Sequence, residues 1–229
     1  MKKISIFIIM LFLAMNVSSQ SGFSLSVFGG VNGSGVKIKD DVYNMQGYTK
    51  MKAGFAAGLK VQYEFRKPLL VEVQSFYNRC SYGITVPNTN MMEHVDFHMD
   101  FISVPVLVGY NFYLGEKESF SISPKVGVVP SFFVNSFARF EKEKYNTKVD
   151  NKVDWRIMLE LEFSWKINNL ISVFMDLDGR AGWDIITYSN ISDIVDNYSA
   201  PGVRNYVLSG NVGVKFKLTN REQEVYEFY

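Results

Sequence analysis

The sequence is poor in cysteine, proline and net charge, and each shortage excludes a class of protein. The single cysteine, Cys80, excludes an internal disulfide framework and a zinc site built from several cysteines. Six prolines in 229 residues exclude a collagen-like or proline-rich chain. The formal net charge of +1 gives no bulk basicity that would indicate a nucleic-acid partner. Aromatic residues, by contrast, make up 15% of the chain, which excludes a disordered protein.

The first residues have the layout of a secretory signal peptide. Lys2 and Lys3 form a positive start, an apolar run follows over residues 4–17, and the small residue Ser19 offers a cleavage position. The run is shorter than the roughly 20 apolar residues of a membrane-spanning helix. We therefore predict a signal peptide over residues 1–19. No other stretch approaches the apolar length of a membrane helix.

The rest of the chain alternates between apolar and polar residues with a period of two, which is the pattern of strands. Between Trp155 and Ile167 every odd position is apolar and nearly every even position is polar. Similar patterns predict eight strands, at residues 23–31, 55–65, 69–77, 102–112, 120–134, 155–167, 171–183 and 206–218. Most are close to the ~9–11 residues that a tilted membrane strand requires. The expected fold is all-β, an eight-stranded antiparallel up-and-down transmembrane β-barrel over residues 20–218.

The connections between these strands alternate between short and long. Short ones fall at residues 66–68, 114–117 and 168–169, and long ones at 32–52, 80–98, 136–152 and 184–203. Outer-membrane barrels have short periplasmic turns and longer extracellular loops. The expected location is therefore the outer membrane of a Gram-negative bacterium. An even strand number then places both termini in the periplasm, with residues 219–229 as a short periplasmic tail.

The face that carries the apolar residues decides between two kinds of barrel. A soluble lipocalin-like barrel turns its apolar side chains inward, and a membrane barrel turns them outward. Aromatic residues gather near both ends of the apolar face, as in the girdles that flank a bilayer: Trp155, Trp183 and Tyr206 at one end, and Phe65, Tyr110, Phe112, Trp165 and Phe216 at the other. This arrangement favours the membrane barrel.

The opposite face of the strands carries charges of both signs. An eight-stranded barrel has room only for its own side chains, so charges enclosed in it must pair. The predicted interior charge network consists of Lys60, Glu64, Glu72, Lys125, Arg156, Glu160, Glu162, Asp176, Asp178, Arg180 and Lys215. The alternative interpretation is an ordinary solvated sheet face.

Two features of the expected strands conflict with regular pairing. Pro105, Pro124 and Pro130 lie inside strands, and a closed barrel has no edge strand for them. The apolar positions also change parity, from odd positions up to Phe101 to even positions from Ile102 onward. We expect bulges or local breaks at the prolines and a bulge at the parity change.

The segment Phe101-Ile-Ser-Val-Pro-Val-Leu-Val-Gly-Tyr110 resembles a strand pattern of the Bacteroidota outer-membrane β-barrel proteins, the PorT-like "porin family". The segment Gly213-Val-Lys-Phe-Lys-Leu218 resembles the closing strand of that family. The same closing strand is similar to the signal read by the barrel-assembly machinery, carried here by Asn211, Gly213, Phe216 and Leu218. The resemblance covers residues 20–218 and implies fold and location. It implies no single activity, because members of such families differ in function.

Few residues suggest chemistry. His94 and His98 are the only histidines and the weak candidates for a metal site, but on a strand they would lie about 13 Å apart. A serine such as Ser81 or Ser199 beside one of them could imitate an outer-leaflet lipid A-modifying enzyme. The lone Cys80 is expected to have no role, and no motif indicates a cofactor or a catalytic residue. Five tyrosines in the long connections could form an adhesive surface or pack on one another: Tyr43, Tyr48, Tyr145, Tyr188 and Tyr198.

Three hypotheses for the function follow. The first is a non-enzymatic barrel with a structural or interaction role through long extracellular loops, the second a narrow porin-like channel, and the third an outer-leaflet lipid A-modifying enzyme. The expected partners are outer-membrane lipid, the barrel-assembly machinery during insertion, and an extracellular ligand or host surface, with no nucleic acid.

Overall fold

A computed structural model of the chain describes residues 22–38, 49–65, 68–87, 92–115, 118–140, 143–146, 148–149, 152–183, 188–189 and 203–218. The predicted signal peptide and the predicted tail lie outside these residues, as do Tyr43, Tyr48, Tyr198 and Ser199. None of the described residues forms a helix of the length and apolarity needed to cross a membrane.

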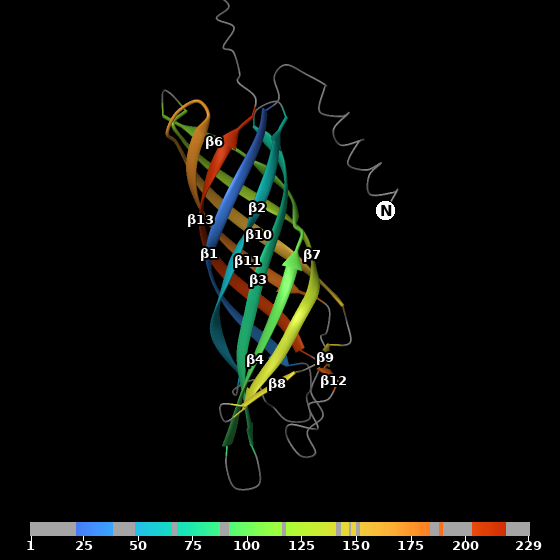
Figure 1. The fold of residues 1–229 in the computed structure, drawn as a ribbon. Coiled ribbons are helices and arrows are strands. Elements are labelled where there is room, and N and C mark those ends of the chain that lie inside the picture. Colours follow the sequence, from blue (N-terminus) through green and yellow to red (C-terminus); the bar gives the residue numbers. More distant parts are fainter. Residues whose placement is uncertain are drawn as a thin grey trace, which may run out of the picture.

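Eight long strand segments close into a ring (Figure 1). The strands are β1 (Gly22–Ile38), β2 (Thr49–Glu64), β3 (Leu69–Pro87), β4 (Met92–Ser103), β5 (Val106–Tyr110), β6 (Phe112–Leu114), β7 (Phe120–Phe140), β8 (Glu143–Asn146), β9 (Lys148–Val149), β10 (Val153–Lys166), β11 (Ile171–Gly182), β12 (Tyr188–Ser189) and β13 (Val203–Lys217). The segments β4, β5 and β6 together form one wall of the barrel. Neighbouring strands pair antiparallel, and β1 pairs with β13 to close the ring. The predicted fold class is confirmed.

The short turns lie at one end of the barrel and are fixed locally. Gly115 has a positive φ of 84° in the turn after β6, a conformation that glycine adopts without steric cost. Between β10 and β11, the Asn168 side chain accepts hydrogen bonds from the backbone N–H groups of Leu170 and Ile171, both at 2.8 Å. We refer to this end as the short-turn end and to the opposite end as the long-loop end.

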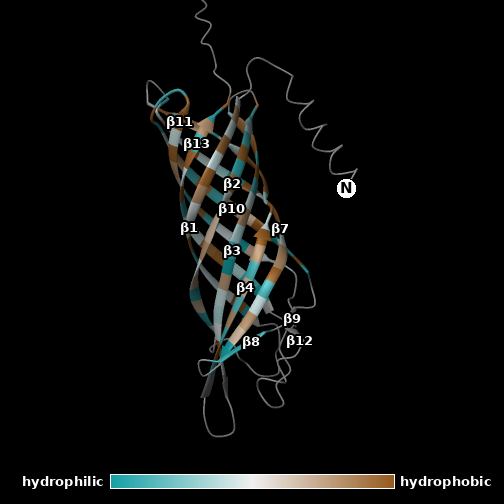
Figure 2. Cartoon of the chain, viewed as in Figure 1, coloured by the Kyte–Doolittle hydropathy of each residue, from teal (hydrophilic) through white to brown (hydrophobic). Residues whose placement is uncertain are grey.

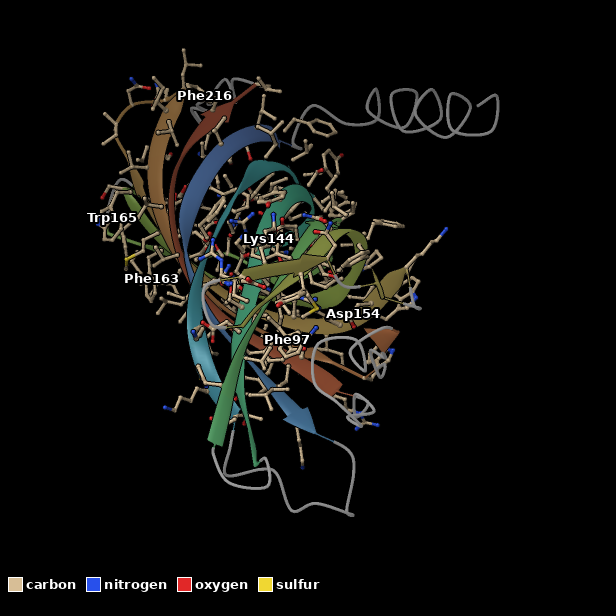
Figure 3. The ribbon with its side chains drawn as sticks, turned by 60° about the horizontal axis from the view of Figure 1, so that its bottom comes forward. Phe97, Lys144, Asp154, Phe163, Trp165 and Phe216 are labelled. Atoms are coloured by element: carbon tan, nitrogen blue, oxygen red, sulfur yellow. The ribbon has the colours of Figure 1, made fainter. Side chains whose placement is uncertain are left out.

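Most of the described apolar side chains of the strands point away from the barrel axis, as a membrane barrel requires. Figure 2 shows hydrophobic and hydrophilic residues alternating along the strands. On β10, Leu159 is 62% exposed while its neighbours Met158 and Glu160 are buried. The aromatic residues predicted to flank the bilayer are all exposed on the outer wall, and Figure 3 shows Phe163, Trp165 and Phe216 at the outside near the short-turn end. The soluble lipocalin-like alternative is thereby excluded.

The walls formed by β3, β4 and β7 continue past the aromatic residues of the long-loop end. There β3 and β4 occupy most of the predicted connection 80–98, and β7 runs to Phe140 and pairs with β8. The prediction that these residues form loops was wrong. We call the region formed by residues 79–87, 92–100, 135–140 and 143–146 the extension.

The parity change near Phe101 marks the boundary of the extension and is not a bulge in β4. The register between β3 and β4 is continuous from Phe76↔Ser103 to Pro87↔Met92. Ile102 faces outward at 45% exposure, whereas Met99 and Phe101 are buried on the inner side. Apolar side chains thus point outward where the wall meets lipid and inward where it rises into water. A register shift does occur at this position, in the ladder between β4 and β7 between Asp100 and Phe101, and the extra residue belongs to β7.

The three prolines interrupt hydrogen bonding without shifting the register. Pro105 falls in the break between β4 and β5, as expected, because proline cannot donate to a ladder. Pro124 and Pro130 lie inside continuous β7, where the register with β10 is unbroken, so β7 itself has neither of the expected features, a bulge or a break, at these two positions. The pairs Ile102↔Phe132 and Val106↔Val128 place Pro130 opposite Val104, in the break of the neighbouring wall.

Candidate functional site

The membrane-spanning part of the barrel encloses a dense ion-pair network, and Lys125 on β7 is its hub. The Lys125 ammonium donates to Glu72 at 2.7 Å, to Glu160 at 2.8 Å and to Glu162 at 2.6 Å. These carboxylates come from β3 and β10, on either side of the wall that carries Lys125. All four side chains are fully buried. Three buried acids around one ammonium form a site in which each charge depends on the others.

Two further lysines extend the network around the ring. Lys60 on β2 donates to Glu160 at 3.0 Å and to Asp176 at 2.6 Å. Lys215 on β13 donates to Gln62 at 2.9 Å and forms an ion pair with Glu162. Since β2, β7, β10, β11 and β13 all contribute, the network ties distant parts of the chain together across the lumen.

Nearer the long-loop end, arginines pack against aromatic rings inside the barrel. Arg156 donates to Asp154 at 2.7 Å, and its guanidinium lies 4.6 Å from the centre of the Phe101 ring. Arg180 pairs with Asp178 at 2.8 Å and lies 5.1 Å from the Phe76 ring. These rings and charges occupy the cross-section above the lysine network. The aromatic residues Phe28, Phe76 and Phe174 form one buried cluster together with Ala56.

The structure places ten of the eleven predicted network residues in buried positions inside the barrel. The eleventh, Glu64, is half-buried at the short-turn end and accepts a hydrogen bond from the Tyr113 hydroxyl. Sequence reasoning missed Asp154, which shares the parity of Arg156 and could have been found from it. It also missed the amide Gln74, which donates to Glu72 and Glu160, both at 2.7 Å.

The three hub acids are also the one group of described residues with metal-ligand geometry. Glu72, Glu160 and Glu162 each offer an oxygen within 4.8 Å of the others. The Lys125 ammonium is hydrogen-bonded to all three and occupies the position that a cation would need. The arrangement is therefore an internal ion pair and does not fit a metal.

The histidines lie on the outer face of the extension and do not converge. His94 is 2.9 Å from Asp96 and 3.2 Å from the Thr85 hydroxyl. His98 contacts the Ser81 hydroxyl at 2.8 Å and stacks on Phe137, with 4.7 Å between ring centres. Burial, and then the nearby Arg139, lower the pKa of His98, so the neutral imidazole is favoured. The neutral ring suits its stacking on Phe137.

Phe137 on β7 is the centre of a second cluster, on the outer face of the extension. Its ring is only 6% exposed because cationic side chains cover it. The distances from the ring centre are 4.3 Å to the Lys144 ammonium, 5.6 Å to the Arg139 guanidinium and 5.9 Å to that of Arg79. Arg79 also forms a two-pronged ion pair with Asp100, whose pKa is lowered by that contact although burial alone would raise it.

The residues of the predicted assembly signal divide between the two faces of β13. Phe216 and Leu218 are exposed on the outer wall. Asn211 points inward and donates to Asp176 at 2.6 Å and to Asp178 at 3.0 Å. At Gly213, a side chain would meet the Phe174 ring and the backbone of Val27. Asn211 and Gly213 therefore have roles in packing the interior.

Comparisons with known proteins agree with this geometry. Residues 17–182 match the family model described as outer membrane protein beta-barrel domain. The structure of the outer membrane protein OprG from Pseudomonas aeruginosa is similar with a TM-score of 0.56 at 14% identity, over 87% of this chain and 97% of that one. Neisserial surface protein A gives a TM-score of 0.46 at 10% identity, over 85% of this chain and 97% of that one.

The attachment invasion locus protein Ail of Yersinia pestis gives a TM-score of 0.40 at 16% identity, over 86% of this chain and 99% of that one. At these identities the likeness shows the fold alone. No curated protein is significantly similar to the chain in sequence.

Proposed function

The chain belongs to the outer membrane protein beta-barrel domain family, and from this membership we propose that it is a closed, non-enzymatic barrel that acts through its long-loop end. Within the family, the segments 101–110 and 213–218 support placing it with the PorT-like proteins of Bacteroidota. Its partners would be membrane lipid, the assembly machinery during insertion and a ligand or host surface outside the cell.

The observation that carries the proposal is the filled interior. An eight-stranded barrel is only wide enough for its side chains to fill. The hub ammonium of Lys125 and its three acids are fully buried, and the aromatic cluster of Phe28, Phe76 and Phe174 lies in the same lumen. Opening a water path would require separating buried ion pairs, which is costly because each charge would lose its partner. A barrel of this kind anchors the protein in the membrane and presents the surface of its long-loop end.

We expect no stable conductance from the purified full-length protein in a planar lipid bilayer. The physical reason is that the described side chains inside the barrel are buried, packed and paired. A general porin in the same bilayer serves as the positive control. Discrete, reproducible channel openings would contradict the closed barrel and favour the narrow porin-like channel.

The proposed orientation places both termini in the periplasm and the long-loop end outside the cell. Its support is the family pattern of short periplasmic turns and longer outer connections. In a Cys80→Ser background, we expect Lys144→Cys to react with a membrane-impermeant maleimide on intact cells. Asn169→Cys, in the short turn after β10, should react only after lysis. The reverse labelling pattern would contradict the orientation.

One contact is compatible with the enzymatic alternative. The Ser81 hydroxyl lies 2.8 Å from His98 Nδ1, on the outer face near the membrane boundary, as the alternative requires. Ser81 is only 1% exposed, however, so an ester bond has no access to its oxygen in this arrangement. A lipid A mass spectrum that stays the same between the wild-type and Ser81→Ala strains would remove this alternative.

A further inference from the structure

Cationic side chains dominate the outer face of the barrel just beyond the aromatic residues of the long-loop end. We call them the basic collar; its members in the described part of the chain are Lys37, Lys50, Lys52, Arg79, Arg139, Lys144 and Arg204. On the same outer face of the described extension, the acids are Asp96 and Asp100. Asp96 pairs with Lys52, and Asp100 pairs with Arg79.

The register shows that the collar side chains face outward. Arg204 is exposed and lies two residues beyond Tyr206, an exposed aromatic residue of the outer wall, and its ladder partner is Lys37. Lys50 pairs with Gly83, where a side chain would meet His94 and Asp96. Arg139 and Lys144 are ladder partners and are both exposed.

The collar begins where the lipid-facing surface ends. The Tyr77 ring lies 5.6 Å from the ring of Phe55, which is 46% exposed on the outer wall. Arg79 lies two residues further along β3, and its guanidinium donates to the Tyr77 hydroxyl at 3.3 Å. Aromatic residues of this kind sit at the level of the headgroups. The cations beyond them therefore lie beside the headgroups and face sideways, along the membrane.

The short-turn end has no such arrangement at its strand positions. The outward side chains at the described strand ends there are apolar: Phe65, Leu69, Phe112, Leu114, Trp165, Phe216 and Leu218. A charge asymmetry between the two ends indicates that the two membrane surfaces differ in charge, with the anionic surface at the long-loop end.

Arg139 and Lys144 are the members of the collar best placed to bind an anion together. Arg79 and Lys52 already have carboxylate partners. Arg139 and Lys144 form no ion pair with any described residue, and both lie over the ring of Phe137, which orders them next to each other. Two adjacent cations over one aromatic ring suit a phosphate group, because guanidinium and ammonium groups both bind phosphate oxygens through charge-assisted hydrogen bonds.

We propose that the basic collar binds the phosphate groups of a phosphorylated glycolipid in the outer leaflet, with Arg139 and Lys144 as the principal ligands. The inference rests on the orientation given under the proposed function. The sideways direction of the patch favours a lipid of the surrounding membrane over a soluble polyanion, which would approach from the end of the barrel. Bound lipid would surround the barrel and hold the extension upright above the membrane.

Native mass spectrometry of the folded full-length protein in a non-ionic detergent tests the proposal, with diphosphorylated lipid A as the probe. We expect the wild type to retain this lipid in at least roughly tenfold excess over the same lipid after dephosphorylation. Each cation near an anionic lipid corresponds to about a fivefold change in affinity, so the double variant Arg139→Ala/Lys144→Ala should lower retention by about 25-fold. Lys166→Ala, at the short-turn end, is the matched control and should leave retention unchanged.

Equal retention of the two lipids by the wild type would overturn the proposal, as would an equal loss in Lys166→Ala. Displacement of the lipid by millimolar inorganic phosphate would show a site for free anions and would overturn the lipid assignment. Heat-modifiable gel migration of each variant confirms that it is folded. The maleimide labelling described above tests the orientation separately, so failure of the orientation and failure of lipid binding give different results.

Discussion

Replacing Lys125 with alanine should strongly destabilise the barrel. The change leaves carboxylate oxygens of Glu72, Glu160 and Glu162 buried within 4.8 Å of one another. It also removes the ammonium that donates a hydrogen bond to each of them. Removing one partner of a buried charge network costs about 3–5 kcal/mol, because the remaining charges lose their compensation. We expect a loss of that size in the free energy of unfolding, measured by urea titration in detergent micelles.

Two further variants serve as comparisons for Lys125→Ala. Lys166→Ala removes an exposed lysine of β10 and should change stability by less than about 0.5 kcal/mol. Lys125→Met combined with Glu160→Gln replaces the lysine by a side chain of similar length and removes one acid, so part of the loss should be recovered. If Lys125→Ala unfolds at the wild-type urea concentration, the network does not stabilise the barrel.

The identity of the interior residues follows from the sequence, but the hub does not. Alternation along β10 is enough to separate Glu160 and Glu162 from Leu159 and Leu161, since successive side chains of a strand point to opposite faces. Which lysine meets which acid depends on how far the strands are staggered around the ring. Lys125 lies 53 residues from Glu72 and 35 residues from Glu160, and no local pattern determines such pairs.

The apolar pattern did not predict the strands of the extension, for a physical reason. The pattern expected of the strands is that apolar residues face lipid, and this holds for Ile102 in β4 and Val106 in β5. Above the membrane the outside is water, so Phe97, Met99 and Phe101 turn inward although the strand keeps its alternation. A change of the strand's surroundings from lipid to water therefore produces the same sequence pattern as a bulge. The Phe137 cluster was missed with it, because its cations come from three strands.

The strongest test of the membrane placement is an arginine at the centre of the lipid-facing wall. Leu159 lies midway along β10 and is 62% exposed on the outside. Replacing it with arginine should cost about 2–4 kcal/mol, which is the penalty for a cation on the lipid face of a barrel at the bilayer midplane. Urea titration of the protein folded in phospholipid vesicles measures this loss, and insertion into the outer membrane should fall with it.

The matched control places the same new charge outside the hydrocarbon layer. Asn135 on β7 is exposed and pairs with Asp100 on the outer face of the extension. Asn135→Arg should change stability by less than about 0.5 kcal/mol, because the added cation lies outside the hydrocarbon layer, beside other cations and an acid. Equal losses for Leu159→Arg and Asn135→Arg would show that the two positions meet the same medium. In that case the change of apolar parity at Phe101 would need an explanation other than the membrane surface.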